Sequence, residues 1–152
     1  MAFGKKIALK YDVQNIKVES LRARLSSKEA SEVLVFDTRE KEEYETSHIQ
    51  SAHLVDPGMS ADVFIQTYGN RIQGKHLIFY CSVGERSSLF IERIRERALK
   101  KGPASLSNLQ GGIFRWYNEN YPVFNRQGET DAIHPFDHYW GRFVRPRNKT
   151  KP

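Results

Sequence analysis

Short apolar runs alternate with segments of helical periodicity along this chain, and that alternation limits the possible folds more than any other feature. Residues 33–36 (Val-Leu-Val-Phe) and 76–80 (His-Leu-Ile-Phe-Tyr) are continuous apolar runs, typical of strands buried on both faces. Weaker strand candidates cover residues 15–18, 52–55 and 104–109. Helical spacing of apolar residues covers 20–28, 61–68 and 87–101, with a final short helix around Phe114, Trp116 and Tyr117. We therefore expect an α/β domain with a mostly parallel central sheet flanked by helices on both faces.

The chain divides into a compact domain and a C-terminal extension. Its 152 residues are enough for one hydrophobic core, and we expect this domain to span residues 1–124. Residues 125–131 are polar and predict a linker at the start of an aromatic and basic extension, 125–152. Within it, aromatic residues recur at helical spacing: Phe136, Tyr139, Trp140 and Phe143. We expect this stripe to pack on the domain's own surface, with a lid or a homodimer arm as the alternatives.

Composition excludes several classes of protein. The net charge of +6 is spread over the chain and is too diffuse to indicate a nucleic-acid partner. No apolar run approaches the ~20 residues needed to cross a bilayer, and the N-terminus lacks the apolar region of a secretory signal. We therefore expect a cytoplasmic protein with no membrane partner. Cys81 is the only cysteine, which excludes an internal disulfide and a Cys-pair zinc site, and we expect no metal and no cofactor.

The only cysteine stands where ligands bind in open parallel sheets. Cys81 directly follows the most hydrophobic predicted strand, and residues 82–86 (Ser-Val-Gly-Glu-Arg) lead into the clearest predicted helix. Loop amides, the start of that helix and Arg86 should all favour a thiolate, so we expect a lowered pKa and a reactive nucleophile at Cys81. The alternative is a buried structural cysteine. Residues 37–40 (Asp-Thr-Arg-Glu) end the neighbouring predicted strand, so polar side chains should meet at this edge of the sheet.

Five ordered sequence elements carry a family resemblance: Asp37-Thr38-Arg39, Glu43-Tyr44, residues 48–52 (His-Ile-Gln-Ser-Ala), residues 81–87 (Cys-Ser-Val-Gly-Glu-Arg-Ser), and residues 109–112 (Leu-Gln-Gly-Gly) with Trp116. At these spacings the chain resembles the rhodanese family from about Val18 to Phe124. The resemblance implies a sulfurtransferase that moves a sulfane sulfur from thiosulfate or a persulfide donor to cyanide or a thiol acceptor.

The resemblance also assigns roles to individual residues. Cys81 would be the nucleophile that carries the persulfide, and Arg86 would hold the persulfide and the incoming anion together with the loop residues Ser82, Val83, Gly84 and Glu85. Ser87 would cap the helix behind the loop. The supporting residues that fix the loop and its arginine would be Asp37, Arg39 and Glu43.

The spacing within the loop bears on the reaction. Phosphatases of the cell-division-cycle type and related arsenate reductases place five residues between the cysteine and the arginine, whereas four separate Cys81 from Arg86 here. A shorter ring of amides suits one terminal sulfur better than a phosphate, which favours sulfur transfer. A phosphatase or arsenate reductase on the same scaffold is an alternative, and so is a non-catalytic module that binds a protein partner.

Three residues depart from the family pattern. Ser51 stands where glycine is usual, a change that should be tolerated unless the backbone there needs a positive φ. Ser82 replaces a frequent arginine, and Glu85 adds a negative charge, so thiosulfate should be a poor donor compared with a persulfide. Because no second cysteine exists to receive the sulfur, the acceptor must be an external small molecule or protein.

Overall fold

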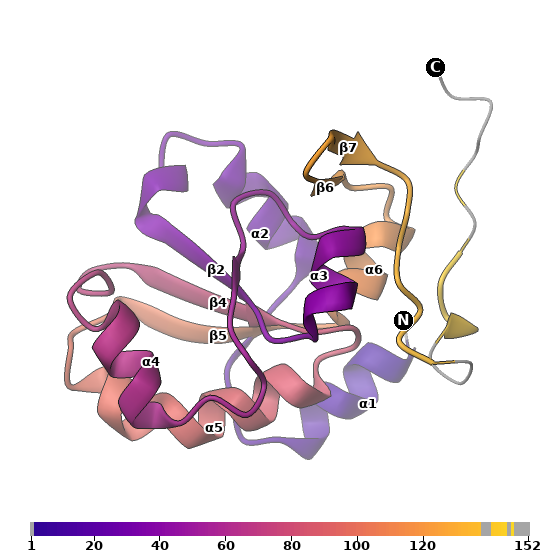
Figure 1. Ribbon diagram of the computed structural model, residues 1–152. Coiled ribbons are helices and arrows are strands. Elements are labelled where there is room, and N and C mark those ends of the chain that lie inside the picture. Colours follow the sequence, from indigo (N-terminus) through magenta and orange to yellow (C-terminus); the bar gives the residue numbers. More distant parts are fainter. Residues whose placement is uncertain (1, 138–140, 146, 148–152) are drawn as a thin grey trace.

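The structure is a computed structural model, and it describes residues 2–137, 141–145 and 147 (Figure 1). At its centre lies a parallel sheet of five strands in the order β1-β5-β4-β2-β3. The strands are β1 (Asn15–Ile16), β2 (Val33–Asp37), β3 (His53–Leu54), β4 (His76–Tyr80) and β5 (Ser105–Leu109). Because β4 is the middle strand, the residue that follows it lies at the middle of the sheet's carboxyl edge.

Helices cover both faces of this sheet. They are α1 (Ala2–Lys10), α2 (Val18–Leu25), α3 (Lys41–Thr46), α4 (Ala61–Tyr68), α5 (Glu85–Leu99) and α6 (Gly112–Asn118), with a short 3₁₀ turn at Ala30–Glu32. Figure 1 shows α4 and α5 on one side of the sheet and α2 and α6 on the other. The expected α/β fold, with a parallel sheet between two helical layers, is confirmed.

Alternate side chains of the central strands enter two separate cores. Ile78 and Tyr80 point into a core shared with α2 and α6. Leu77 and Phe79 point into a core shared with α4 and α5. Both faces of β4 are therefore dry, which explains why its sequence is a continuous apolar run. The first residue after β4, Cys81, is buried as well.

Some boundaries and elements differ from the sequence-based expectation. Residues 15–18 form a strand of only two residues, because Val18 already begins α2. The linker predicted over residues 125–131 is wrong, since β6 (Val123–Asn125) and β7 (Gly128–Thr130) form an antiparallel hairpin. The helices α1 and α3 were not expected. Of the aromatic stripe, Tyr139 and Trp140 lie outside the described residues.

Two further features complete the fold. Ser51 adopts a φ of 65°, the left-handed conformation that glycine tolerates best. The backbone at this position therefore does need a positive φ, so serine in place of the usual glycine is strained. Within residues 2–137, 141–145 and 147, none of the helices is both long and apolar enough to cross a membrane.

Candidate active site

Cys81 lies directly after β4 and is the centre of the candidate site. Its side chain is buried, with a relative exposure of 1%. The backbone N–H of Gly84 donates a hydrogen bond to the sulfur at 3.2 Å, and the Ser87 hydroxyl lies 3.5 Å from the same atom. The loop after β4 thus turns back on its own cysteine, as the sequence predicted for this strand–loop–helix segment. Hydrogen bonds of this kind stabilise an anionic sulfur.

Glycine allows the loop to make this turn. Gly84 has a φ of 109° and is the residue before the first turn of α5. A side chain at this position would be strained by the backbone conformation, and its Cβ would lie only 3.1 Å from the Asn108 side chain. The turn aims the N–H of Gly84 at Cys81, so the glycine positions the donor of the sulfur's hydrogen bond.

The start of α6 clamps the loop from the other side. The backbone N–H of Ile113 donates to the carbonyl of Cys81 at 2.9 Å, and that of Phe114 donates to the carbonyl of Ser82 at 3.1 Å. This close approach requires Gly112, because a Cβ there would lie 2.5 Å from the Cys81 carbonyl oxygen. The sequence element at residues 109–112 therefore acts on the site by holding the loop.

Ser87 does not cap α5, which corrects the role expected for it. The residue before the helix is Gly84, and no side chain caps this end of α5. Ser87 instead donates to Asn108 Oδ1 at 2.5 Å, while Asn108 Nδ2 donates to Asn15 Oδ1 at 2.9 Å. A hydroxyl has one proton, so Ser87 can donate either to Asn108 or, after rotation, to the sulfur of Cys81. The chain of side chains fixes the hydroxyl beside the sulfur.

Arg86 and Glu43 form a two-point ion pair beside the loop. Arg86 Nη1 and Nη2 donate to the two Glu43 carboxylate oxygens at 2.8 and 3.0 Å. Ser82 joins them, because its hydroxyl accepts from Arg86 Nη2 at 2.9 Å and donates to Glu43 at 3.2 Å. This is the planar, bidentate geometry that suits a guanidinium and a carboxylate. Glu43 is thus the carboxylate that fixes the arginine of the loop.

The ion pair keeps both groups charged. Burial alone would raise the pKa of Glu43, but the hydrogen bonds and positive charge of Arg86 outweigh it and hold that pKa below its ordinary value. Burial would likewise lower the pKa of Arg86, yet hydrogen bonding to Glu43 and the nearby Cys81 and Glu43 charges raise it. A permanent cation therefore lies close to the cysteine.

Glu43 is held in place by its own helix. The carboxylate of Glu43 accepts from the backbone N–H of Glu40 at 3.0 Å, which forms a capping box at the start of α3. Glu43 therefore stabilises the start of α3 and also binds Arg86, which lies in the first turn of α5. The family resemblance indicated that Glu43 supports the arginine, but the helix that carries Glu43 was not predicted, because α3 has only six residues and little apolar periodicity.

Asp37 and Arg39 do not contact Arg86, the arginine of the loop, although they were expected to help fix it. Arg39 donates to Asp37 through Nε at 3.0 Å and Nη2 at 2.7 Å, and both side chains are fully buried. The Tyr80 hydroxyl donates to Asp37 at 2.6 Å and accepts from the backbone N–H of Ile49 at 3.1 Å. This buried network ties the end of β4 to the end of β2, so it supports the strand from which Cys81 emerges.

Glu85 and Val83 complete the predicted loop residues. The Glu85 carboxylate turns toward α1, where it accepts from the Tyr11 hydroxyl at 3.1 Å and lies 3.7 Å from Lys10 Nζ. Burial raises the pKa of Tyr11, and the charge of Glu85 raises it further. Val83 is buried in the core beneath the loop. The negative charge of Glu85 is therefore offset by a neighbouring lysine.

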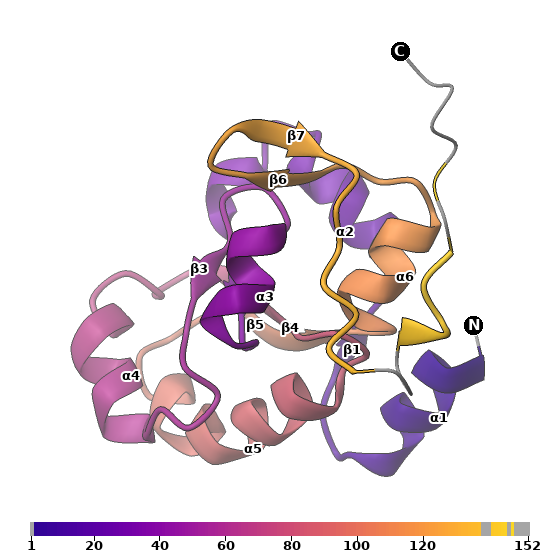
Figure 2. The same ribbon diagram turned by 45° about the vertical axis from the view of Figure 1, so that its right-hand side comes forward.

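A cavity of about 270 Å³ opens in front of the cysteine. It is lined by Cys81, Ser82, Val83, Glu85, Arg86, Leu89 and Phe136. Phe136 comes from the segment after β7, which in Figure 2 descends beside α6 toward the end of α5 that lies nearest α1. The lid expected as an alternative for the extension thus has one described residue in contact with the site. No sequence pattern pairs this phenylalanine with the loop.

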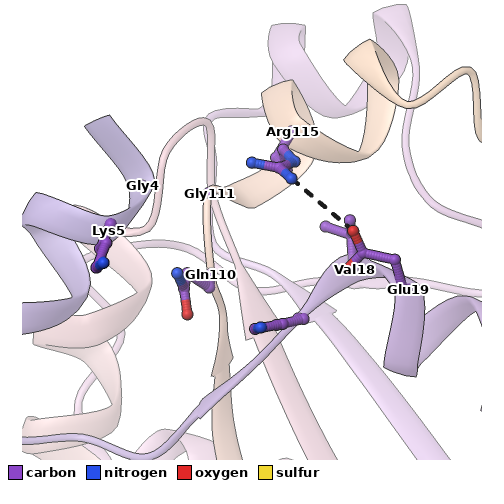
Figure 3. A pocket seen from close by; sticks show the side chains of 8 residues that line it. Gly4, Lys5, Val18, Glu19, Gln110, Gly111 and Arg115 are labelled. Atoms are coloured by element: carbon purple, nitrogen blue, oxygen red, sulfur yellow. Dashed lines mark ion pairs between the residues drawn. The ribbon is translucent and has the colours of Figure 1, made fainter. Parts of the chain in front are cut away.

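A larger cavity, of about 620 Å³, lies at the carboxyl ends of β1 and β5 (Figure 3). Arg115 and Glu19 form an ion pair across it at 3.8 Å, with Lys5 and Gln110 on another wall. It contains no thiol, and its lining residues make no arrangement of nucleophile and base. We therefore place the candidate active site in the smaller cavity. In the part of the chain that the structure describes, no three His, Cys, Asp or Glu side chains gather as metal ligands.

Known proteins share this fold and sequence pattern. Residues 17–119 match the family model for the rhodanese-like domain. No curated protein matches the sequence. A solved thiosulfate sulfurtransferase from Pseudomonas aeruginosa is similar in structure, with 17% identity and a TM-score of 0.64; the match covers 93% of this chain but only 25% of that one.

Smaller solved proteins are similar over most of their length. A protein from Bacillus halodurans has 20% identity and a TM-score of 0.61, with 76% of this chain and 80% of that chain covered. A rhodanese-like domain protein from Staphylococcus aureus has 22% identity and a TM-score of 0.52, with 68% and 90% covered. At these identities the structures show a common fold. The family model, however, covers more than half of the chain, and this chain therefore belongs to the family of rhodanese-like domains.

Proposed function

We propose that this protein is a sulfurtransferase that carries a sulfane sulfur on Cys81. The observation that supports it most is the setting of the sulfur: it accepts the Gly84 N–H at 3.2 Å, it lies beside the Ser87 hydroxyl, and it faces a cavity that also contains the Arg86 cation. A sulfur with these neighbours can act as an anionic nucleophile. A purely structural cysteine needs neither the donors nor the cavity.

The first half of the reaction loads the sulfur. The Cys81 thiolate attacks the outer sulfur of a donor whose terminal sulfur is joined to a second sulfur, as in thiosulfate (⁻O₃S–S⁻) or a persulfide (R–S–S⁻). A new S–S bond forms on Cys81 as the donor's S–S bond breaks. The electron pair of the broken bond leaves with the rest of the donor molecule. With thiosulfate the leaving group is sulfite; with a persulfide it is a thiolate. The total charge is the same on both sides, so no oxidant or reductant is needed.

The second half of the reaction unloads the sulfur. A nucleophile such as cyanide or a thiolate attacks the outer sulfur of the Cys81 persulfide. The S–S bond to Cys81 breaks, the thiolate is restored, and the product is thiocyanate or a new persulfide. Since Cys81 is the only cysteine, this acceptor comes from outside the chain.

Arg86 supports both halves through its charge. Its guanidinium offsets the negative charge on the attacking sulfur and on the persulfide, and Glu43 holds it at one orientation through two hydrogen bonds. The pair is preorganised because Ser82 and the capping box of α3 fix the carboxylate. The loop therefore needs little rearrangement when charge moves to the outer sulfur.

Intact-mass measurement tests the proposal. Treatment with thiosulfate or a persulfide donor should add one sulfur, about 32 Da, to the chain, because only one thiol can receive it. Cyanide should remove this mass and release one thiocyanate per chain. The Cys81→Ser variant should show neither change, and a matched Ser88→Cys variant in the Cys81→Ser background controls for a thiol placed elsewhere on the same loop and helix.

Two results would contradict the proposal. The first is an unchanged mass for the wild-type protein with every donor, combined with Cys81-dependent hydrolysis of a phosphate ester, which would support the phosphatase alternative. The second is an unchanged mass together with alkylation of Cys81 no faster than that of a free thiol at neutral pH. That second result would support a module that binds a partner without catalysis.

A further inference from the structure

The C-terminal strap, by which we mean the described residues from Asp131 onward, is fastened to α6 at both of its ends. At the first end, the Tyr117 hydroxyl donates to the carbonyl of Asp131 at 2.5 Å. At the second, Asn118 Nδ2 donates to the carbonyl of Phe143 at 2.7 Å. Arg147 donates to the carbonyl of Tyr117 at 3.0 Å, and its guanidinium lies 3.9 Å from the centre of the Tyr117 ring. The strap follows β7, and hydrogen bonds tie both its beginning and its later part to α6.

Between these ends, the strap places Phe136 over the candidate active site. The centre of its ring lies 4.2 Å from the guanidinium carbon of Arg86, within the range of a cation–π contact. Phe136 adopts a φ of 68°, a strained conformation for an aromatic residue. The turn is held by hydrogen bonds from the Phe136 N–H to His134 and from the Asp137 N–H to the Pro135 carbonyl. These hydrogen bonds thus hold an unfavourable backbone conformation at the residue whose ring lies on Arg86.

The ring changes the chemistry of the cavity. Together with Val83 and the half-exposed Leu89, Phe136 gives it an apolar wall. Among the described residues that line the cavity, Arg86 is the only cation, and two hydrogen bonds pair it with the Glu43 carboxylate. A dianion such as thiosulfate would therefore meet little uncompensated positive charge here, whereas an apolar group would have a surface to contact.

We propose that Phe136 is a specificity-determining residue, and that its ring selects organic sulfur donors with an apolar body over thiosulfate. The inference rests on the proposed sulfurtransferase function and names its donor class: a persulfide R–S–S⁻ or a thiosulfonate R–SO₂–S⁻ in which R is an alkyl or aryl group. With a thiosulfonate, the Cys81 thiolate takes the outer sulfur and the sulfinate R–SO₂⁻ leaves with the electrons of the broken S–S bond. The cavity volume of about 270 Å³ is close to the lower limit for small-molecule sites, which suits a donor of this size.

The segment that carries Phe136 lies outside residues 17–119, which match the family model. The site's nucleophile and arginine therefore come from the family domain, while this wall comes from the extension that follows it. Specificity supplied in this way can differ from that of relatives that keep the same catalytic loop.

Three donors of graded chemistry test the proposal, with cyanide as the acceptor throughout. Benzenethiosulfonate and methanethiosulfonate have the same charge and differ in their apolar group, and thiosulfate adds a second negative charge. In the wild-type protein, kcat/KM should be about tenfold higher for benzenethiosulfonate than for methanethiosulfonate, and lowest for thiosulfate. In Phe136→Ala, the ratio between the two thiosulfonates should fall about five- to tenfold, through KM, with kcat within about twofold of wild type.

Conservative and distant variants separate a specificity role from a structural one. Phe136→Leu should keep most of the ratio, because it retains an apolar contact. Leu99→Ala, at an exposed position at the far end of α5, should leave the ratio unchanged. If Phe136→Ala keeps the wild-type ratio within about twofold while Cys81 still gains a sulfur, the role of Phe136 is refuted and the sulfurtransferase proposal stands. If no donor adds a sulfur to Cys81 in the wild-type protein, both proposals fall.

Discussion

Replacing Glu43 by glutamine removes one charge from the ion pair that holds Arg86 beside the Cys81 loop, and it should lower both stability and the proposed sulfur transfer. Glutamine has nearly the same shape, but its NH₂ group faces the N–H groups of Arg86, so two donors meet. Glu43 is buried, with 2% exposure of its side chain, and it accepts Arg86 at 2.8 and 3.0 Å. A buried cation would be left without its full partner.

The expected loss follows from these contacts. Two charge-assisted hydrogen bonds are worth about 1.5–3 kcal/mol each when removed from a buried site. The Arg86 side chain is 21% exposed, so water can replace part of the lost interaction. We therefore expect the free energy of unfolding to fall by about 2–3 kcal/mol, and Tm to fall by about 4–12 °C for a chain of this size. Urea unfolding at pH 7 measures the first quantity and a thermal scan the second.

Glu42→Gln is the matched control, because Glu42 is the neighbouring residue on α3 and is exposed. It removes the same charge without touching Arg86, and it should change stability by less than about 0.5 kcal/mol. The reasoning is refuted if Glu43→Gln unfolds within that same margin of the wild-type protein. A fall in stability equal in both variants would also contradict it, since the cause would then be the charge of the helix rather than the ion pair.

Other predictions follow from the same contacts. The stability lost in Glu43→Gln depends on pH, because the pKa of Glu43 is below its ordinary 4.5 and the ion pair therefore contributes fully above about pH 5. As pH falls below 4.5, the difference in the free energy of unfolding between the variant and the wild type should shrink. Urea titrations at pH 7, 5 and 3 measure this difference. Ser51→Gly should raise the free energy of unfolding by about 0.5–1 kcal/mol, because glycine relieves the φ of 65°; equal or lower stability in urea would count against it. Gly112→Ala should reduce sulfur transfer at least tenfold, since its Cβ would displace the Cys81 carbonyl; normal thiocyanate release would contradict the clamp by α6.

Much of the fold is visible in the sequence because burial on both faces produces a simple pattern. The strand at residues 76–80 and the helix at residues 61–68 were predicted with the bounds that the structure shows. The first is a continuous apolar run and the second has apolar residues at helical spacing, so each pattern indicates whether the segment is a strand or a helix. The hairpin at residues 123–130 was missed because each of its strands has only three residues, too few to show an alternating apolar pattern. The six-residue α3 was missed because it is too short to show a helical stripe of apolar residues.

The site was predictable only in part. Cys81 and Arg86 could be found because Cys81 directly follows the most apolar predicted strand and four residues separate it from Arg86. Glu43 was expected to support the arginine through the family resemblance, and the contact exists. Asp37 was grouped with it because both carboxylates belong to matching elements, but a buried Arg39 beside it is the closer partner. Phe136 lies 50 positions beyond Arg86, and only the folded strap brings them together.

The central claim is that the Cys81 persulfide is a true intermediate, and rapid mixing tests this most directly. Protein loaded with sulfur and freed of donor is mixed with cyanide, and thiocyanate is followed through the first turnover. We predict one thiocyanate per chain, formed at a rate no slower than kcat measured with the same cyanide concentration. A persulfide that releases its sulfur more slowly than kcat, or not at all, would contradict the claim, because the reaction would then bypass the sulfur on Cys81.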